Sequence, residues 1–140
     1  MAEWLLRKLL QDRPIAGVQV RSAGFIALPG NTVTDLAMLV AKEHGVDLSQ
    51  HRAQPLTSSL IRDADLILVM EPGHRLELLY HRAEAASKVF LLSHFAPSGD
   101  RDRGIADPYG MDMEAYRLCF QEIRECVESL FDWFSNVRYG

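Results

Sequence analysis

The sequence has little of what marks several large classes of protein. It contains only two cysteines, too few for a disulfide framework or a zinc site with four cysteine ligands. Its longest apolar runs are five or six residues, whereas a membrane-spanning helix needs roughly 20. Lys and Arg number 15 against 19 Asp and Glu, which leaves a net charge of -4. We therefore expect no basic surface for nucleic acid or an anionic membrane.

Several chemical motifs are missing from the sequence as well. It has neither a Walker A motif nor a G-x-G-x-x-G loop, and its histidines show no metal-binding spacing, so we expect no cofactor and no metal. The first ten residues do not resemble a signal peptide, because Glu3 stands where basic residues are expected. With 140 residues, 48% of them hydrophobic, the chain is predicted to be one cytoplasmic domain over residues 1–140.

The spacing of apolar residues predicts that helices and strands alternate. Helical periodicity predicts three helices, over residues 1–11, 33–44 and 112–134. Three segments have the pattern of strands, namely residues 17–21, 65–70 and 88–92. Thr32 is the expected cap of the second helix, and Gly45 its expected end. With a short helix after the second strand, this order predicts an α/β fold, a three-layer sandwich with a mainly parallel sheet.

Polar residues follow the predicted strands, where the ligand crevice of a parallel sheet lies. Ser22 follows the first strand and Glu71 the second, while His51 lies in the loop after the second helix. Asp107 is held extended by the proline after it and precedes Tyr109, so it is a candidate general acid beside an aromatic ring. Each feature also has an ordinary structural explanation, as a turn, a helix start or an exposed loop.

The two cysteines fall on the last predicted helix. Cys119 and Cys126 are seven residues apart, which places them on one face about 10 Å from each other, too far for a disulfide. Both lie on or near the apolar stripe of this helix. We therefore expect them to be buried structural thiols rather than reactive ones.

Taken in order, these segments resemble the low-molecular-weight protein-tyrosine-phosphatase family, especially its bacterial branch linked to exopolysaccharide tyrosine kinases. The resemblance rests on Met-Ala-Glu heading a helix, Ser-Ala-Gly after a strand, His-Arg-Ala-Gln after the second helix, and Asp-Pro-Tyr. It implies hydrolysis of phosphotyrosine on proteins, a bacterial tyrosine kinase among them, through a cysteinyl-phosphate and without a metal. In the family a Cys-x5-Arg loop supplies the nucleophile and binds the phosphate with its amides and arginine.

The resemblance implies roles for five residues of this chain. Asp107 matches the general acid, which protonates the leaving phenolate and then activates water. Tyr109 matches an aromatic wall for the phosphotyrosine ring, and Leu28 a variable-loop position that lines the pocket. Ser22 and His51 match a hydrogen-bonding pair that supports the phosphate loop from below.

The chain departs from the family pattern at the nucleophile. In the family, Met-Ala-Glu directly follows the first strand and the Cys-x5-Arg loop, and this sequence begins at that Met. Six residues after its two cysteines it has Glu125 and Asp132, where the motif has arginine. We therefore expect no nucleophile and no activity in these 140 residues. The family's first strand lies between the strands matched by residues 17–21 and 65–70, so we expect unpaired strand edges and self-association.

Three functional interpretations follow. The first is a full phosphatase of which this chain is the part that starts at an internal methionine, and the retention of Asp107, Ser22 and His51 favours it. The second is a non-catalytic, self-associating pseudophosphatase or interaction module. The third, thiol-dependent arsenate reduction, requires a cysteine pair ahead of the Asp-Pro loop. Both cysteines of this chain come after that loop, which argues against the third.

Overall fold

Helices make up most of the structure, which is a computed structural model that describes residues 1–25 and 34–139. Its α-helices are α1 (Ala2–Asp12), α2 (Asp35–Glu43), α3 (Ser58–Asp63), α4 (Pro72–His81) and α5 (Met113–Tyr139). The strands are β1 (Ile67–Val69) and β2 (Val89–Leu91), and two 3-10 helices flank β2, η1 (Ala83–Lys88) and η2 (Leu92–Phe95). Within the two described ranges, no helix is both long enough and apolar enough to cross a membrane.

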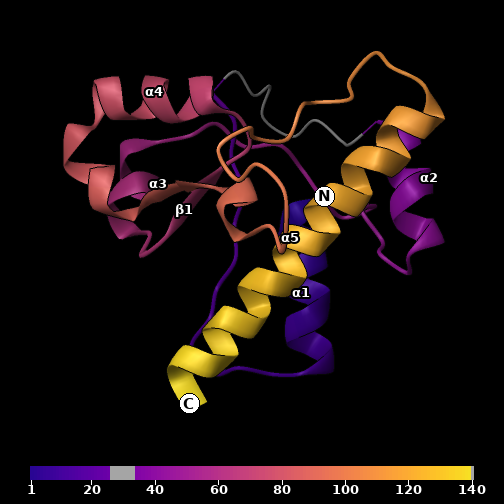
Figure 1. The fold of residues 1–140 in the computed structure, drawn as a ribbon, viewed down its shortest axis with the longest axis horizontal. Helices are drawn as coiled ribbons and strands as arrows, with labels where there is room; N and C mark the ends of the chain where they lie inside the picture. The colour runs from indigo at the N-terminus through magenta and orange to yellow at the C-terminus, as the bar shows by residue number, and fades with distance from the viewer. Residues whose placement is uncertain (26–33, 140) are drawn as a thin grey trace.

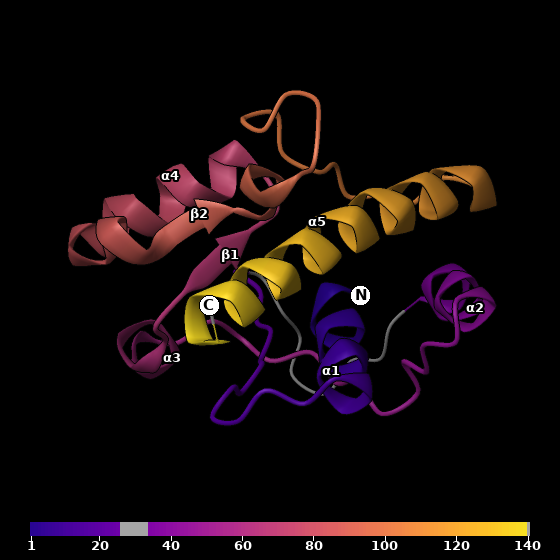
Figure 2. The ribbon, with the colours of Figure 1, turned by 60° about the horizontal axis from the view of Figure 1, so that its bottom comes forward.

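The two strands form a parallel pair that separates two hydrophobic cores. Ile67 pairs with Val89, and Val69 with Leu91. Because side chains alternate along a strand, Leu68 packs against the core built by α1, α2 and α5, while Val69 and Val89 belong to the core with α3 and α4. Figure 2 shows β1 and β2 between α4 and α5. The predicted α/β class with layers of helices on both faces of a parallel sheet is confirmed, although the sheet is small.

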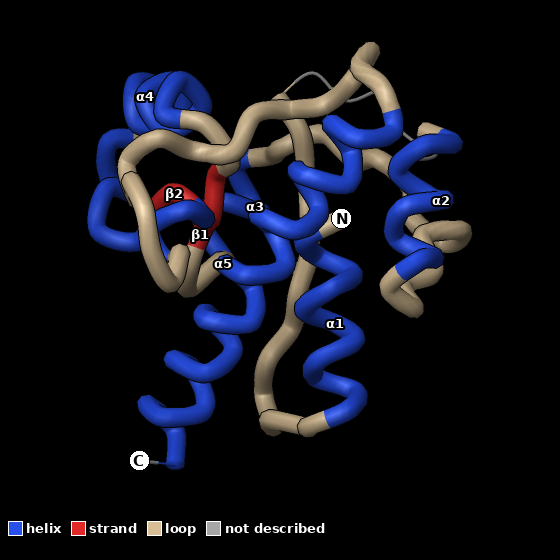
Figure 3. The backbone as a smooth tube through the Cα atoms, turned by 45° about the vertical axis from the view of Figure 1, so that its right-hand side comes forward, coloured by secondary structure: helices blue, strands red, loops and turns tan. Residues whose placement is uncertain are grey.

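The C-terminal helix α5 is the main support of the larger core. Most of its side chains at the predicted 3–4 spacing are almost completely buried, among them Phe120, Ile123, Leu130 and Phe131. Burying a side chain of this size contributes about 1.5–3 kcal/mol. Helix α5 packs against α1, α2 and η2, and Figures 1 and 3 show α1 running beside it. In this way α5 fixes α1 relative to the strand pair.

The strand predicted over residues 17–21 is not formed, which corrects that prediction. Residues 18–23 have neither helical structure nor a strand ladder, and the nearest pairing is an isolated parallel bridge between Gly24 and Pro55. A strand requires a neighbour with which to exchange backbone hydrogen bonds, and among the described residues β1 pairs with β2 alone. One backbone carbonyl of this segment, that of Val20, accepts a side-chain hydrogen bond from Arg7 at 2.7 Å instead.

The start of α2 also differs from the prediction. The helix begins at Asp35, and its N-cap is Thr34, whose Oγ1 accepts the Ala37 N–H at 3.3 Å. Thr32, the predicted cap, lies outside the described residues. Two threonines stand close together in this segment, and only the position of the first helical turn decides which of them caps it.

Helix α3 was not predicted. Its signal in the sequence is weak, because a six-residue helix shows less than two turns of periodicity. Thr57 caps its start by accepting the Leu60 N–H at 3.2 Å. At its other end Lys88 Nζ donates to the carbonyls of Ile61 and Ala64 at 2.6 and 2.7 Å. Those carbonyls belong to the end of the helix, where intrahelical partners are lacking, so a residue from a distant segment completes this helix.

Candidate functional site

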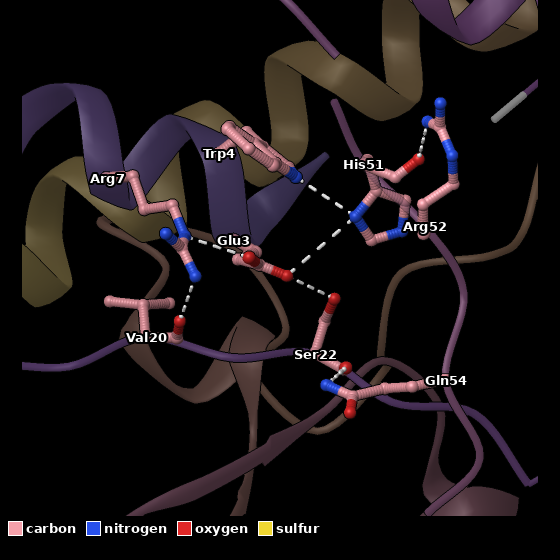
Figure 4. A network of polar contacts seen from close by, with 8 residues as sticks. All are labelled: Glu3, Trp4, Arg7, Val20, Ser22, His51, Arg52 and Gln54. Atoms are coloured by element: carbon pink, nitrogen blue, oxygen red, sulfur yellow. Dashed lines mark hydrogen bonds and ion pairs between the residues drawn. The ribbon is translucent and has the colours of Figure 1, made fainter. Parts of the chain in front are cut away.

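A largely buried carboxylate lies at the centre of the site. It belongs to Glu3 in the first turn of α1, whose side chain is 10% exposed. Its Oε1 accepts a hydrogen bond from Ser22 Oγ at 2.5 Å, and its Oε2 lies 2.8 Å from Nε of Arg7, one helical turn further along. Figure 4 shows both contacts. A buried carboxylate is costly without such partners, so Glu3 orders the two groups around it.

His51 approaches the same carboxylate from another direction. Its Nδ1 lies 3.9 Å from Glu3 Oε1 and accepts a hydrogen bond from Trp4 Nε1 at 3.0 Å. Burial lowers the pKa of His51, and the charge of Glu3 opposes part of that shift. Ser22 and His51, which the family resemblance pairs with each other, therefore both point to Glu3 in this structure. Their described contacts include no direct hydrogen bond between the two.

Hydrogen bonds between the loop that carries Ser22 and the loop that follows His51 hold these two residues close together. Gln54 Nε2 donates to the Ser22 carbonyl at 2.8 Å. The Gly24 N–H donates to the Gln54 carbonyl at 3.0 Å, and the Leu56 N–H to the Gly24 carbonyl at 2.9 Å. These bonds lock the chain after residues 18–21 to the chain after His51, and so the network is held by two loops and one helix.

Asp107 and Tyr109 lie together in the loop before α5. Asp107 Oδ1 accepts the Tyr109 N–H at 3.0 Å, which closes a turn around Pro108. Pro108 is buried, whereas Asp107 is exposed and Tyr109 is 74% exposed. The turn therefore carries an exposed carboxylate and an exposed aromatic ring. The Asp-Pro sequence indicated the turn, and the roles of Asp107 and Tyr109 stay predictions.

The first turn of α1 lies near both groups of residues. Met1 packs against the hydrophobic core to which Cys119 of α5 belongs. Cys119 Sγ contacts the Ala106 carbonyl at 3.6 Å. The structure thus brings the Asp107 loop and the Glu3 network to the same end of α1. This end of a helix carries partial positive charge and favours anions.

The remaining candidates have no comparable position. Leu28 lies outside the described residues. Cys119 and Cys126 are buried as predicted, and burial, reinforced by nearby acidic residues, raises the pKa of each thiol to about 11. Neither is therefore a thiolate near neutral pH. In the part of the chain that the structure describes, no group of three or more His, Cys, Asp or Glu side chains is arranged to hold a metal ion.

Glu3 and Trp4 are site residues that the sequence alone did not reveal. An acidic residue in the first turn of a helix is common because it complements the helix dipole, so Glu3 carries no distinct signal of its own. Its spacing of four residues from Arg7 indicates an ion pair. Its contacts with Ser22 and His51 join segments that are distant in the sequence, and no local pattern reports them.

Comparisons with known proteins agree on the family. Residues 1–138 match the family described as low molecular weight phosphotyrosine protein phosphatase. The chain is 37% identical over 139 residues to the probable low molecular weight protein-tyrosine-phosphatase EpsP of Ralstonia nicotianae, covering 99% of this chain and 86% of the relative. The chain therefore belongs to the low-molecular-weight phosphotyrosine protein phosphatase family, which confirms the resemblance inferred from the sequence.

Solved structures show the same relationship. The YwlE arginine phosphatase from Geobacillus stearothermophilus is similar with a TM-score of 0.86 and 30% identity, covering 99% of this chain and 87% of that one. The tyrosine phosphatase AmsI of Erwinia amylovora is similar with a TM-score of 0.81 and 32% identity, covering 94% of this chain and 81% of that one. Relatives of this fold thus include phosphatases named for two different phosphorylated amino acids.

Proposed function

We propose that this protein is a protein-tyrosine phosphatase of the family, with Asp107 as its general acid. The observation that carries the proposal is the Asp107 turn, which lies at the same end of α1 as the Glu3 network. In the proposed reaction a cysteine thiolate of a Cys-x5-Arg loop attacks phosphorus while Asp107 protonates the leaving phenolate. Asp107 then takes a proton from the water that hydrolyses the cysteinyl-phosphate.

The other candidate residues take supporting roles in this proposal. The Tyr109 ring lines the path of the phosphotyrosine ring, and Leu28 lines the pocket. Ser22 and His51, held through Glu3, support the phosphate loop. The substrate is a phosphotyrosine protein, for which a bacterial tyrosine kinase is the expected partner from the family resemblance, and a cytoplasmic location stays a prediction.

The 140 residues by themselves are proposed to be inactive. Neither cysteine is followed by arginine at the sixth position, and both thiols are buried with a pKa of about 11. Losing the nucleophile of a concerted site costs several orders of magnitude in rate. The loss of phosphate-binding amides and arginine adds to this, because electrostatic stabilisation is usually the largest contribution.

Hydrolysis of p-nitrophenyl phosphate tests both parts of the proposal. The 140-residue protein and its Asp107→Asn variant are expected to show equal, background rates. A version with the family's first strand and Cys-x5-Arg loop placed directly before Met1 is expected to be active, and Asp107→Asn should lower its rate about 10²- to 10⁴-fold. Turnover by the 140 residues that falls on mutation of Asp107 would contradict inactivity. If the extended protein is active and Asp107→Asn leaves its rate unchanged, the role of Asp107 as general acid is contradicted.

Hydrolysis of phosphoarginine is the second candidate activity. It is favoured by the similarity to the arginine phosphatase over 99% of this chain. The exposed Tyr109 ring favours phosphotyrosine, since an aromatic substrate ring gains from stacking. The extended protein should therefore hydrolyse a phosphotyrosine peptide with a higher kcat/KM than a phosphoarginine peptide, and Tyr109→Ala should reduce that preference. The reverse preference would assign the protein to arginine phosphatases.

A non-catalytic role through self-association is the alternative to catalysis. The described residues favour it in one respect, because among them β1 pairs only with β2 and residues 18–23 form no strand ladder. Exposed strand edges of this kind pair readily with a second copy. Sedimentation velocity of the 140-residue protein should then show dimers or larger species that increase with concentration. A single monomeric species at all concentrations would rule this role out.

A further inference from the structure

The start of α4 has an acidic side chain that its own helix does not use. Glu71 is the N-cap residue, yet its side chain makes no capping hydrogen bond. Its backbone carbonyl accepts the N–H groups of His74 and Arg75 at 3.0 and 3.3 Å. The short side chains preferred at an N-cap, those of Ser, Thr, Asp and Asn, accept from an amide of the first turn, whereas the longer glutamate side chain can reach a partner outside the helix. Here Glu71 Oε1 accepts the N–H of Asp107 instead, at 3.4 Å and 36 residues further along the chain.

The loop before Asp107 is docked on the same part of the molecule. The Ile105 N–H donates to the Met70 carbonyl at 2.7 Å. Gly104 has a φ of +81°, and a Cβ placed there would lie 2.7 Å from the Met70 carbonyl oxygen and 2.8 Å from Pro72 Cδ. Residues 104–107 therefore rest closely on the end of β1 and the start of α4. The hydrogen bond from the Asp107 N–H to Glu71 continues these contacts to the residue that carries the proposed acid.

Asp107 is thus held on two sides. Its N–H donates to Glu71, and its Oδ1 accepts the Tyr109 N–H at 3.0 Å. Glu71 is partly exposed, and the first of these bonds lies at the exposed surface of the protein. A hydrogen bond to a charged acceptor is stronger than one between neutral groups, so the carboxylate is well suited to fix the peptide from which Asp107 projects.

We propose that Glu71 is a positioning residue for the general acid. Its carboxylate fixes the Asp107 peptide and so sets where the acid side chain stands relative to the leaving group, without touching the substrate. The catalytic meaning of this inference rests on the proposed role of Asp107. Positioning matters because a displacement of about 1 Å in an active site costs about 10²-fold in rate.

Amide hydrogen exchange by NMR on the ¹⁵N-labelled 140-residue protein tests the inference without requiring activity. Glu71→Ala should speed exchange of the Asp107 amide about tenfold, as the loss of one hydrogen bond to a charged group predicts. Glu71→Gln keeps an acceptor oxygen and should restore most of the protection. Glu77→Gln, which changes an exposed carboxylate on the same helix, is the matched control and should leave the Asp107 amide unchanged.

The amides of the β1–β2 pair provide the second readout. They should exchange at the same rate in all variants, since the proposed bond acts on one peptide and not on global stability. The inference is overturned if Glu71→Ala leaves the Asp107 amide unchanged, if Glu71→Gln does not restore protection, or if the strand amides accelerate equally. This outcome is distinguishable from a failure of the proposed function, which is decided by the activity of the extended protein with Asp107→Asn.

Discussion

Replacing Gly104 by alanine tests how closely the Asp107 loop is docked. Gly104 has a φ of +81°, and its added Cβ would meet the Met70 carbonyl oxygen at 2.7 Å and Glu71 Cα at 3.2 Å. Gly99 offers a matched control, because its φ of +87° is nearly the same but nothing lies within 4 Å of the added Cβ. The two variants share the cost of a left-handed backbone, and only one of them also has a steric clash.

The expected magnitudes follow from these two contributions. A left-handed conformation costs a non-glycine residue about 1–2 kcal/mol, partly offset by about 0.4–1 kcal/mol from the less flexible unfolded chain. Forcing a methyl group into filled space adds about 1–3 kcal/mol. The Cβ at Gly104 would meet backbone atoms, which cannot move aside as the end of a flexible side chain can. Gly104→Ala should therefore lower the free energy of unfolding by about 1–3 kcal/mol more than Gly99→Ala.

Urea unfolding followed by tryptophan fluorescence measures this difference. With a slope of about 1–3 kcal/mol per molar urea, the midpoint of Gly104→Ala should lie about 1 M below that of Gly99→Ala. Equal midpoints for the two variants would refute the reasoning. They would mean that the loop does not rest on the end of β1, and the docking on which the role of Glu71 depends would then be lost as well.

The further predictions concern three other parts of the structure. Glu3→Gln should lower the pKa of His51 further, because the Glu3 charge opposes the effect of burial; an unchanged histidine titration by NMR would contradict this. Since the folded-state pKa of His51 lies below the usual 6.5, stability should fall as pH drops through 6.5, and more steeply in Glu3→Gln. Lys88→Met should lower the unfolding free energy by about 1–3 kcal/mol, because the carbonyls ending α3 lose their charged donor; an unchanged urea midpoint would argue against it. Cys119 and Cys126 should react with a thiol reagent at pH 8 only after unfolding, and rapid labelling of the native protein would contradict their burial.

Much of the fold could be predicted because its signals are local. The apolar spacing along α5 and the continuous apolar run around β1 indicate both the type of element and its approximate ends. The strand expected at residues 17–21 shows the limit of this reasoning. Alternation predicts an extended backbone, but the formation of a strand depends on a neighbour that a local pattern does not specify.

The candidate site also has a part that local sequence patterns predict and a part that depends on the tertiary structure. The turn joining Asp107 to Tyr109 forms within three residues, so its proline and spacing were sufficient to predict it. The role of Glu71 was hidden, because its position before Pro72 reads as an ordinary helix start. Its carboxylate turns to Asp107 only because β1 and the loop before α5 meet in the folded chain.

The sequence by itself determined the approximate places of helices α1, α2, α4 and α5, the two apolar strands, the Asp107 turn and the burial of the two cysteines, since each depends on neighbours within a few residues or on one face of one helix. Tertiary structure decided which strands pair, how Ser22 and His51 meet through Glu3, and what Glu71 binds. These contacts join residues that are far apart along the chain. Their energies depend on distances that exist only once α5 has packed against α1 and η2.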